Sequence, residues 1–370
     1  MPPTSQHPIL MPAAPKIRPL EGVTVLDFTT LLPGPLATLT LADAGARVIK
    51  IEPIGGEAAR HLEPFLGDGE QRMSAPYAIL NRGKTVIELD TRQAAARETV
   101  LALVKTADVV VEQFRLGVMK RLGLDYGELR EINPRLVYCS ISSYGQAGPS
   151  ALESGHDINY QARTGVLSLS PGPLERPTLP PVLTADIGAG TLPAIFNIML
   201  ALFRRERTGE GAYLDIAIAD GMFAFATPSL WQGRVTGEFP RPGESRLLGG
   251  LPRYDLYATR DDRLIAVGAL EEKFWRSFCD LIGLPEALRR DHETPTETRQ
   301  AVAARISEST AAEWGARFAS TDCCANVVAT LEEALRDPQF VARGLFSAVA
   351  PLSNGQTAPA AVTPLAPIYR

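Results

Sequence analysis

The sequence predicts an α/β fold: a large, open, Rossmann-like parallel sheet covered by helices, followed by a smaller α+β domain. The first observation is a strand–helix–strand unit, in which apolar runs at 23–28 and 46–51 flank a helix that opens at Pro33-Gly34-Pro35. Two strands joined through a helix lie parallel in one sheet. The second observation is that this alternation continues along the chain, and the third is a change of texture at 238–243.

The remaining elements of the large domain follow the same alternation. We expect strands at 85–89, 109–111, 136–141 and 213–218, and helices at 94–104, from just after Asp186 to about 205, and over most of 220–237. No G-x-G-x-x-G follows the first strand, so the pattern does not indicate a dinucleotide site. Gly83-Lys84-Thr85 resembles the end of a phosphate-binding P-loop, but Ala78 stands where its first glycine belongs and a strand follows.

The proline-rich stretch at 238–243 marks a domain boundary. A hairpin follows at 254–259 and 264–267, and helices begin near Glu271, Glu297 and Ala311. The predicted organisation is a large domain over 1–225 that is completed by 340–370, a linker at 226–245, and a small α+β domain at 246–330. Residues 331–370 are predicted to be a linker and a C-terminal return to the large domain.

Composition limits the classes of function. The chain has 370 residues, of which 45% are hydrophobic and 21% charged, as in soluble globular proteins. A net charge of −5 does not favour nucleic acid or an anionic membrane as a partner. The apolar run at 192–203 contains Pro193 and Asn197 and is too short to cross a bilayer.

The cysteines and the N-terminus indicate the cellular compartment of the protein. The four cysteines are scattered without a C-x-x-C pair, which disfavours a disulfide framework or a thiolate metal site. The first residues lack the charged start and apolar core of a secretory signal. We therefore expect a cytoplasmic protein that binds no metal.

Gly155-His156-Asp157-Ile158-Asn159-Tyr160 is the stretch that most suggests chemistry. Asp157 can cap a helix that begins at Ile158, which would place His156 at a helix N-terminus that favours negative charge. A base in that position suits chemistry next to a carbonyl group. The same residues also fit a polar turn with a capping aspartate. Asp186, just before a second apolar helix, likewise fits an N-cap or an Asx turn.

Taken together, this hexapeptide and Ala185-Asp186-Ile187-Gly188-Ala189-Gly190 resemble the α-methylacyl-CoA racemases of the family III CoA-transferase (CaiB/BaiF) superfamily. The resemblance extends over nearly the whole chain, including residues 41–46, 109–115, 204–211 and 267–271. It implies an acyl-CoA substrate, no separate cofactor, and an interlocked homodimer. Each active site would lie between the large domain of one subunit and the small domain of the other.

The resemblance also implies roles for individual residues. His156 and Asp186 correspond to the two acid/base groups, and Glu271 to the glutamate that pairs with the histidine of the partner subunit. The positions that correspond to CoA contacts are Leu89, Asp90, Thr91, Arg92, Gln113, Phe114, Arg115, Arg121, Gly155, Asp157, Ile158, Asn159 and Tyr160.

Racemisation at the carbon next to a thioester needs a base on one face, an acid on the other, and stabilisation of the enolate oxygen. His156 and Asp186 can fill these roles if burial raises the pKa of the aspartate. Glu271 would orient His156, and backbone N–H groups near Asp157 would hold the enolate oxygen.

Two departures from the racemases leave an alternative open. Pro53 follows Glu52 where racemases commonly carry a CoA-binding arginine, so that Lys50, Arg60 or Arg72 would have to replace it. Residues 55–80 resemble the transferase branch, in which an aspartate at the position of Asp157 is the nucleophile. An acyl-CoA:carboxylate CoA-transferase is therefore the alternative, and a CoA-binding regulatory protein without turnover is a third.

Overall fold

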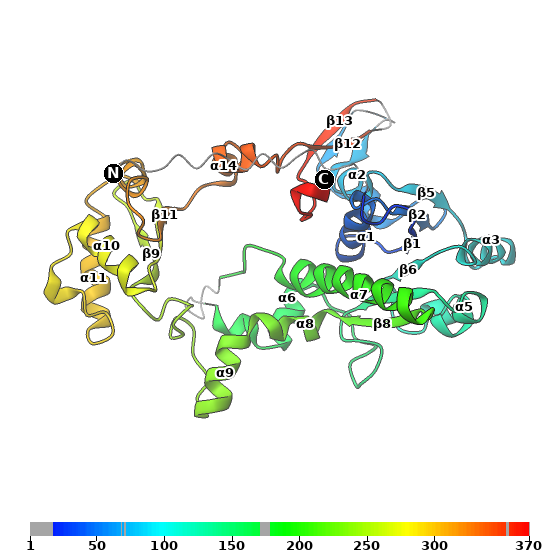
Figure 1. The fold of residues 1–370 in the computed structure, drawn as a ribbon, viewed down its shortest axis with the longest axis horizontal. Coiled ribbons are helices and arrows are strands. Elements are labelled where there is room, and N and C mark those ends of the chain that lie inside the picture. The colour runs from blue at the N-terminus through cyan, green and yellow to red at the C-terminus, as the bar shows by residue number, and fades with distance from the viewer. Residues whose placement is uncertain (1–17, 68, 70–71, 171–177, 353–354, 370) are drawn as a thin grey trace. The chain divides into compact units, whose positions relative to one another are not determined.

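The computed structural model describes residues 18–67, 69, 72–170, 178–352 and 355–369 (Figure 1). The chain forms two compact units. The first contains the described parts of Met1–Tyr160, Leu183–Gly221 and Gln339–Arg370, and the second those of Gln161–Val182 and Met222–Pro338.

A parallel sheet of six strands forms the centre of the first unit. In spatial order its strands are β5 (Thr85–Glu88), β2 (Arg47–Glu52), β1 (Thr24–Phe28), β6 (Val109–Glu112), β7 (Val137–Ser142) and β8 (Ala212–Ala217). All neighbouring pairs are parallel. The order reverses direction between β1 and β6, and at such a point the loops leaving the two strands open a crevice for ligands. The expected parallel α/β sheet is confirmed.

Helices cover the sheet because it is apolar on both faces. Leu26, Ile49, Val110 and Tyr138 are buried in a core that also holds residues of α3 (Ala94–Val104) and α5 (Tyr126–Ile132). Helix α7 (Leu192–Thr208) contacts β7, β8 and α1 (Pro33–Asp43), and Figure 1 shows it running alongside β8. Burying both faces in this way is the usual requirement of a parallel sheet.

Helix α7 continues directly from a π-helix, η4 (Thr184–Thr191), so that the two form one helical run of 25 residues. This run is long and apolar enough to cross a membrane, whereas the sequence analysis considered only the 12 residues 192–203. Its Ala194, Ile198 and Ala201 are buried in the first unit. Core helices of soluble proteins share this length and composition, so the run by itself is weak evidence for a membrane.

Smaller elements complete the first unit. A C-terminal hairpin of β12 (Ala348–Pro351) and β13 (Thr357–Ala360) packs its alanines on α2 (Ala75–Asn81). The others are η1 (Ala58–His61), β3 (Phe65–Leu66), β4 (Met73–Ser74), α4 (Val118–Arg121), η6 (Pro367–Tyr369) and the first residues of α6 (Asp157–Arg163) and α8 (Ile218–Phe225).

The second unit contains an antiparallel sheet in the order β11 (Ala325–Val327), β10 (Leu264–Gly268), β9 (Tyr254–Ala258). Trp275, Phe278 and Trp314 fill the core between this sheet and the helices. Those helices and the remaining elements are η3 (Val166–Leu169), α9 (Thr227–Thr236), α10 (Glu272–Ile282), η5 (Glu286–Leu288), α11 (Pro295–Ile306), α12 (Ala311–Phe318) and α13 (Leu331–Ala334). Helix α14 (Pro338–Ala342) begins at the last residue of the second unit, and its other residues belong to the first.

The division differs in one respect from the sequence-based boundary at residue 225. Residues 161–170, 178–182 and 222–225 belong to the second unit. Val166, Leu169 and Phe225 line one cavity together with Leu256 of β9, so their apolar contacts tie these segments to the small sheet. Hydrophobic periodicity defines the elements themselves but carries no information about such long-range contacts.

Candidate active site

A cavity of about 330 Å³ opens in the first unit where the strand order reverses. Its walls come from the segments that follow β1 and β6, from the end of β7, from the start of α8 and from the chain around α6. The lining residues that bear on the chemistry are Leu31, Gln113, Phe114, Arg115, Gly155, His156, Tyr160, Asp186 and Ile218. Residues far apart in the sequence thus meet at the carboxyl end of the sheet, where open α/β folds bind ligands.

The turn that carries His156 is held by the side chain of Tyr160. The Tyr160 hydroxyl donates a hydrogen bond to the Gly155 carbonyl oxygen and lies 3.0 Å from Ser143 Oγ. A Cβ atom at Gly155 would lie 2.6 Å from the tyrosine ring, so only glycine fits there. The His156 N–H donates to Asn159 Oδ1 at 2.9 Å. These contacts fix the backbone from which the histidine reaches the cavity.

Asp157 joins this turn to the π-helix. Its carboxylate is buried, and Oδ2 accepts the N–H groups of Ala185 at 2.8 Å and Asp186 at 3.0 Å. Helix α6 begins at Asp157 itself, one residue before the expected start. A carboxylate that accepts two backbone N–H groups is a strong, directional link. Asp157 therefore holds His156 and Asp186 at one site.

Asp186 is not a helix cap. It is the third residue of η4, the N-cap position is Leu183, and no side chain caps that end. Burial raises the pKa of the Asp186 carboxyl to about 6; the negative charge of Asp157 adds to this effect and His156 opposes it. The capping and Asx-turn interpretations are wrong because the chain winds into a π-helix that starts before Asp186. Helical segments of this rare kind are frequent at functional sites.

In addition to this cavity, the described residues form another one, of about 750 Å³, around α4. Thr91, Arg92 and Arg121 line it, together with Arg97 and Lys120. Among the interactions described for this part of the chain, Arg92 pairs with Asp90 and Arg97 with Glu128, whereas Lys120 and Arg121 have no ion-pair partner. The cavity therefore offers positive charge for an anionic ligand.

The other residues that were expected to contact CoA do not line either of these two cavities. Leu89 packs against the sheet core, Ile158 is largely exposed, and Asn159 binds the backbone of His156. Glu271 is an exposed residue of the second unit, at the N-cap of α10.

Of the three proposed substitutes for the missing arginine, Lys50 is excluded because its side chain is fully buried in an ion pair with Glu57. Arg60 binds Glu52 and Arg72 lies over the ring of Phe65.

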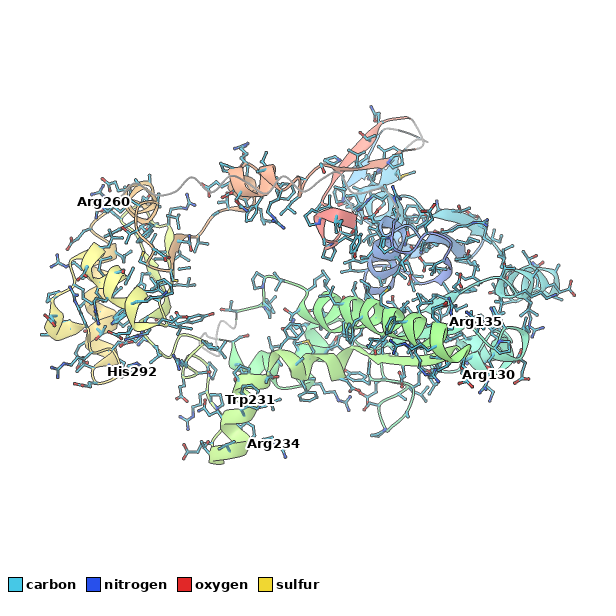
Figure 2. The ribbon with its side chains drawn as sticks, viewed as in Figure 1. Arg130, Arg135, Trp231, Arg234, Arg260 and His292 are labelled. Atoms are coloured by element: carbon cyan, nitrogen blue, oxygen red, sulfur yellow. The ribbon has the colours of Figure 1, made fainter. Side chains whose placement is uncertain are left out.

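Several lining residues were missed by the sequence analysis: Thr30, Leu31, Leu32, Pro33, Ser142, Ser143, Glu153 and Ile218. Residues 30–33 lie just after the strand predicted at 23–28, and Ile218 is the last residue of the strand predicted at 213–218. The rule that ligands bind at the carboxyl ends of strands could therefore have found them. No three His, Cys, Asp or Glu side chains cluster as a metal site in the described ranges. His292 is an exposed residue of the second unit (Figure 2).

The comparisons with known proteins agree on one family. A family model described as CoA-transferase family III matches residues 20–366. An alpha-methylacyl-CoA racemase of Homo sapiens is 35% identical over 335 residues, which are 88% of this chain and 82% of the relative. An acetyl-CoA:oxalate CoA-transferase of Acetobacter aceti is 34% identical over 344 residues, which are 90% of this chain and 87% of the relative. The two activities thus occur in relatives of nearly equal similarity.

Among solved structures, a CaiB/BaiF family protein from Brucella suis superposes with a TM-score of 0.78 at 30% identity, covering 95% of this chain and 97% of that one. Rv3272 from Mycobacterium tuberculosis superposes with a TM-score of 0.80 at 29% identity, covering 95% and 94%. The fold described above is therefore the fold of these relatives.

Proposed function

The chain belongs to the family III CoA-transferases, and from this premise we propose that it racemises 2-methyl-branched acyl-CoA thioesters through an enolate. The observation that carries the proposal is the pair of His156 and Asp186 in one cavity, with the pKa of Asp186 raised to about 6. A carboxyl group with this pKa can both accept and return a proton near neutral pH. No cofactor is required, since CoA is part of the substrate.

In this mechanism, His156 and Asp186 lie on opposite faces of the α-carbon. One removes the proton while the other, already protonated, delivers a proton to the opposite face, and the roles exchange with the handedness of the substrate. Backbone N–H groups near Asp157 stabilise the enolate oxygen, and Glu271 of the partner subunit orients His156. The CoA moiety extends toward Arg121 and Lys120, whose charges suit its phosphates.

The second candidate is a CoA-transferase that forms an anhydride at Asp157. The similarity to the Acetobacter aceti transferase favours it. Against it, Asp157 is only 7% exposed and its Oδ2 already accepts two backbone N–H groups. A nucleophile must reach the thioester carbon, whereas a buried, hydrogen-bonded carboxylate serves better as a structural link.

The first test separates these reactions. Without any carboxylic acid acceptor, the enzyme should exchange the α-proton of 2-methylpropanoyl-CoA for deuterium in D2O, because racemisation needs only solvent protons. Mass spectrometry of the recovered thioester measures the exchange. In the transferase case no α-deuterium would appear, CoA would move only to an added acid, and Asp157→Ala would lose more activity than His156→Ala.

A second test uses the charge of Asp157. For the enantiomer whose proton Asp186 removes, kcat/KM should fall as the pH drops through about 6, since Asp186 must be ionised to act as the base. Asp157→Asn removes the neighbouring charge and keeps an oxygen that can accept the two N–H groups. The fall should then occur at a lower pH, closer to the ordinary aspartate value. An unchanged midpoint would show that Asp157 does not act on Asp186.

We also propose that the protein is a cytoplasmic homodimer that binds neither nucleic acid nor membrane. Exposed apolar side chains form one stripe along α7: Leu192, Phe196, Met199, Leu200 and Phe203. Their spacing of three and four residues places them on one face of the helix. Trp231 of α9 is also exposed (Figure 2). The stripe along α7 is by itself a contiguous exposed apolar surface, and such a surface marks an interface.

The α7 stripe provides the test of assembly. Wild-type protein should sediment as a dimer without detergent, and Phe196→Asp should shift it toward monomer because a charge would be buried in the interface. Ile54→Asp is the matched control, since Ile54 is equally exposed but lies outside the stripe. A wild-type monomer, or a protein that remains soluble only in detergent, would reject this assembly.

A further inference from the structure

Leu31 has an unusual backbone for its residue type. Its φ is 62°, in the left-handed region that residues other than glycine, asparagine and aspartate seldom adopt. Strain of this kind persists where surrounding contacts enforce it, and it is found preferentially at ligand sites. Leu31 lines the cavity that holds His156 and Asp186.

A buried ion pair enforces this conformation. The Leu31 N–H donates to Glu57 Oε2 at 2.9 Å. The other oxygen of Glu57 lies 2.9 Å from Lys50 Nζ, as an ion pair without hydrogen-bond geometry, and both side chains are almost fully buried. Lys50 also donates to the Thr29 carbonyl oxygen at 2.6 Å.

The partners of Glu57 are fixed in turn. The Glu57 N–H donates to Glu52 Oε2 at 3.2 Å, and Glu52 Oε1 accepts the Tyr77 hydroxyl at 2.7 Å. At the far end of the loop, the Gly34 N–H donates to Gln113 Oε1 at 3.0 Å. The loop between β1 and α1 is thus anchored at both ends and at Leu31, so the position of this side chain is determined by polar contacts behind it.

The composition of the cavity wall suggests what Leu31 does there. Leu31, Leu32, Pro33, Phe114 and Ile218 supply apolar surface, whereas His156, Tyr160 and Asp186 supply polar groups. An acyl-CoA bound with its α-carbon between His156 and Asp186 must place the substituents of that carbon against the remaining wall. Leu31 is 37% exposed, so its side chain is available for contact.

We propose that Leu31, positioned by Glu57, is a specificity-determining residue that limits the size of the acyl substituent at the α-carbon. This inference rests on the proposed function for the placement of the acyl group. It adds one residue, Glu57, that acts on selectivity only through the backbone of Leu31. Lys50 supplies the charge that neutralises the buried Glu57 carboxylate.

The first experiment compares binding of 2-methylpropanoyl-CoA and 2-phenylpropanoyl-CoA by calorimetry, with CoA alone as the reference. Leu31→Gly removes the side chain and tolerates the left-handed backbone. It should shift the ratio of the two dissociation constants toward the phenyl compound by about 10-fold or more, the usual effect of reshaping an apolar pocket. A ratio within about twofold of wild type would overturn the proposal.

The second experiment tests, with two matched double variants, whether the hydrogen bond from the Leu31 N–H to Glu57 positions Leu31. Lys50→Met/Glu57→Gln and Lys50→Met/Glu57→Met both remove the buried charges and both lose the bond from Lys50 to Thr29. Uncharged replacements of a buried ion pair are usually tolerated. Only the glutamine variant keeps an acceptor for the Leu31 N–H, so it should retain the wild-type ratio while the methionine variant loses it. Equal ratios in the two variants would overturn the role of Glu57.

Both experiments measure binding, so their outcome is distinguishable from failure of the proposed function. Absence of α-deuterium exchange in the wild-type enzyme would reject racemisation. The ratio of dissociation constants would still report whether Leu31 limits the acyl group. Circular dichroism spectra of all variants provide the check on folding.

Discussion

Asp186→Asn and His156→Ala are each expected to lower racemisation by about 10²–10⁴-fold, the range for loss of a positioned acid or base. Inversion needs a proton donor and a proton acceptor on opposite faces, so neither group can replace the other. The surviving group can still remove a proton from one enantiomer and return a solvent proton to the same face. The two variants should therefore retain deuterium exchange for opposite enantiomers.

The measurement is wash-in of deuterium into each pure enantiomer of a 2-methylacyl-CoA. Circular dichroism of each variant verifies the fold. Equal residual exchange of both enantiomers in both variants would contradict the assignment of two bases. So would full racemisation by Asp186→Asn, because an asparagine cannot act as an acid or base.

The second large effect concerns stability and does not depend on the reaction. Asp27→Ala is expected to lower the free energy of unfolding by about 3–5 kcal/mol, because this is the usual cost of removing one partner of a buried ion pair. Asp27 lies at the end of β1, fully buried, and Oδ2 lies 3.0 Å from Lys84 Nζ. It also accepts hydrogen bonds from Thr29 and Thr38. The substitution leaves the lysine charge buried without a counter-ion.

Urea denaturation followed by circular dichroism measures this effect. Glu128→Ala is the control, because its ion pair with Arg97 is exposed and should contribute at most about 1 kcal/mol. Asp27→Ala/Lys84→Met should be more stable than Asp27→Ala, since no unpaired charge remains. Equal stability of Asp27→Ala and Glu128→Ala would refute the importance of the pair.

The sequence predicted the elements better than the contacts between them. Apolar runs and helical periodicity placed the strands of the six-stranded sheet and the β9–β10 hairpin within a few residues, and the helix predicted at 94–104 has the bounds of α3. These patterns are local, because the residues of a single chain segment are enough to show whether it forms a strand or a helix. The short strands β3, β4, β11, β12 and β13 were not predicted. The same local reading rejected Gly83-Lys84-Thr85 as a P-loop, and Lys84 is indeed buried in the pair with Asp27.

The candidate site was predicted only where a motif carried it. His156 and Asp186 were recognised by their flanking residues, and the structure places both on one cavity. Lys50 was considered as a replacement for the CoA-binding arginine absent at Pro53, but it is buried in an ion pair with Glu57 and cannot reach CoA. The left-handed Leu31 had no signal at all, since leucine ordinarily avoids that conformation. Long-range hydrogen bonds determine these features, and no sequence window contains them.

The π-helix also constrains how the chain can change in length. Because η4 continues into α7 without a break, the angular position of Asp186 around the helix axis is set by the buried side chains of α7. Adding or removing one residue between Asp186 and Ala194 would turn Asp186 relative to the sheet by roughly the 100° that one residue contributes to an α-helix. Insertions and deletions acquired during evolution should therefore be tolerated before Leu183 and eliminated between Asp186 and Ala194. Asp186 keeps its place only because the number of residues between it and Ala194 is fixed.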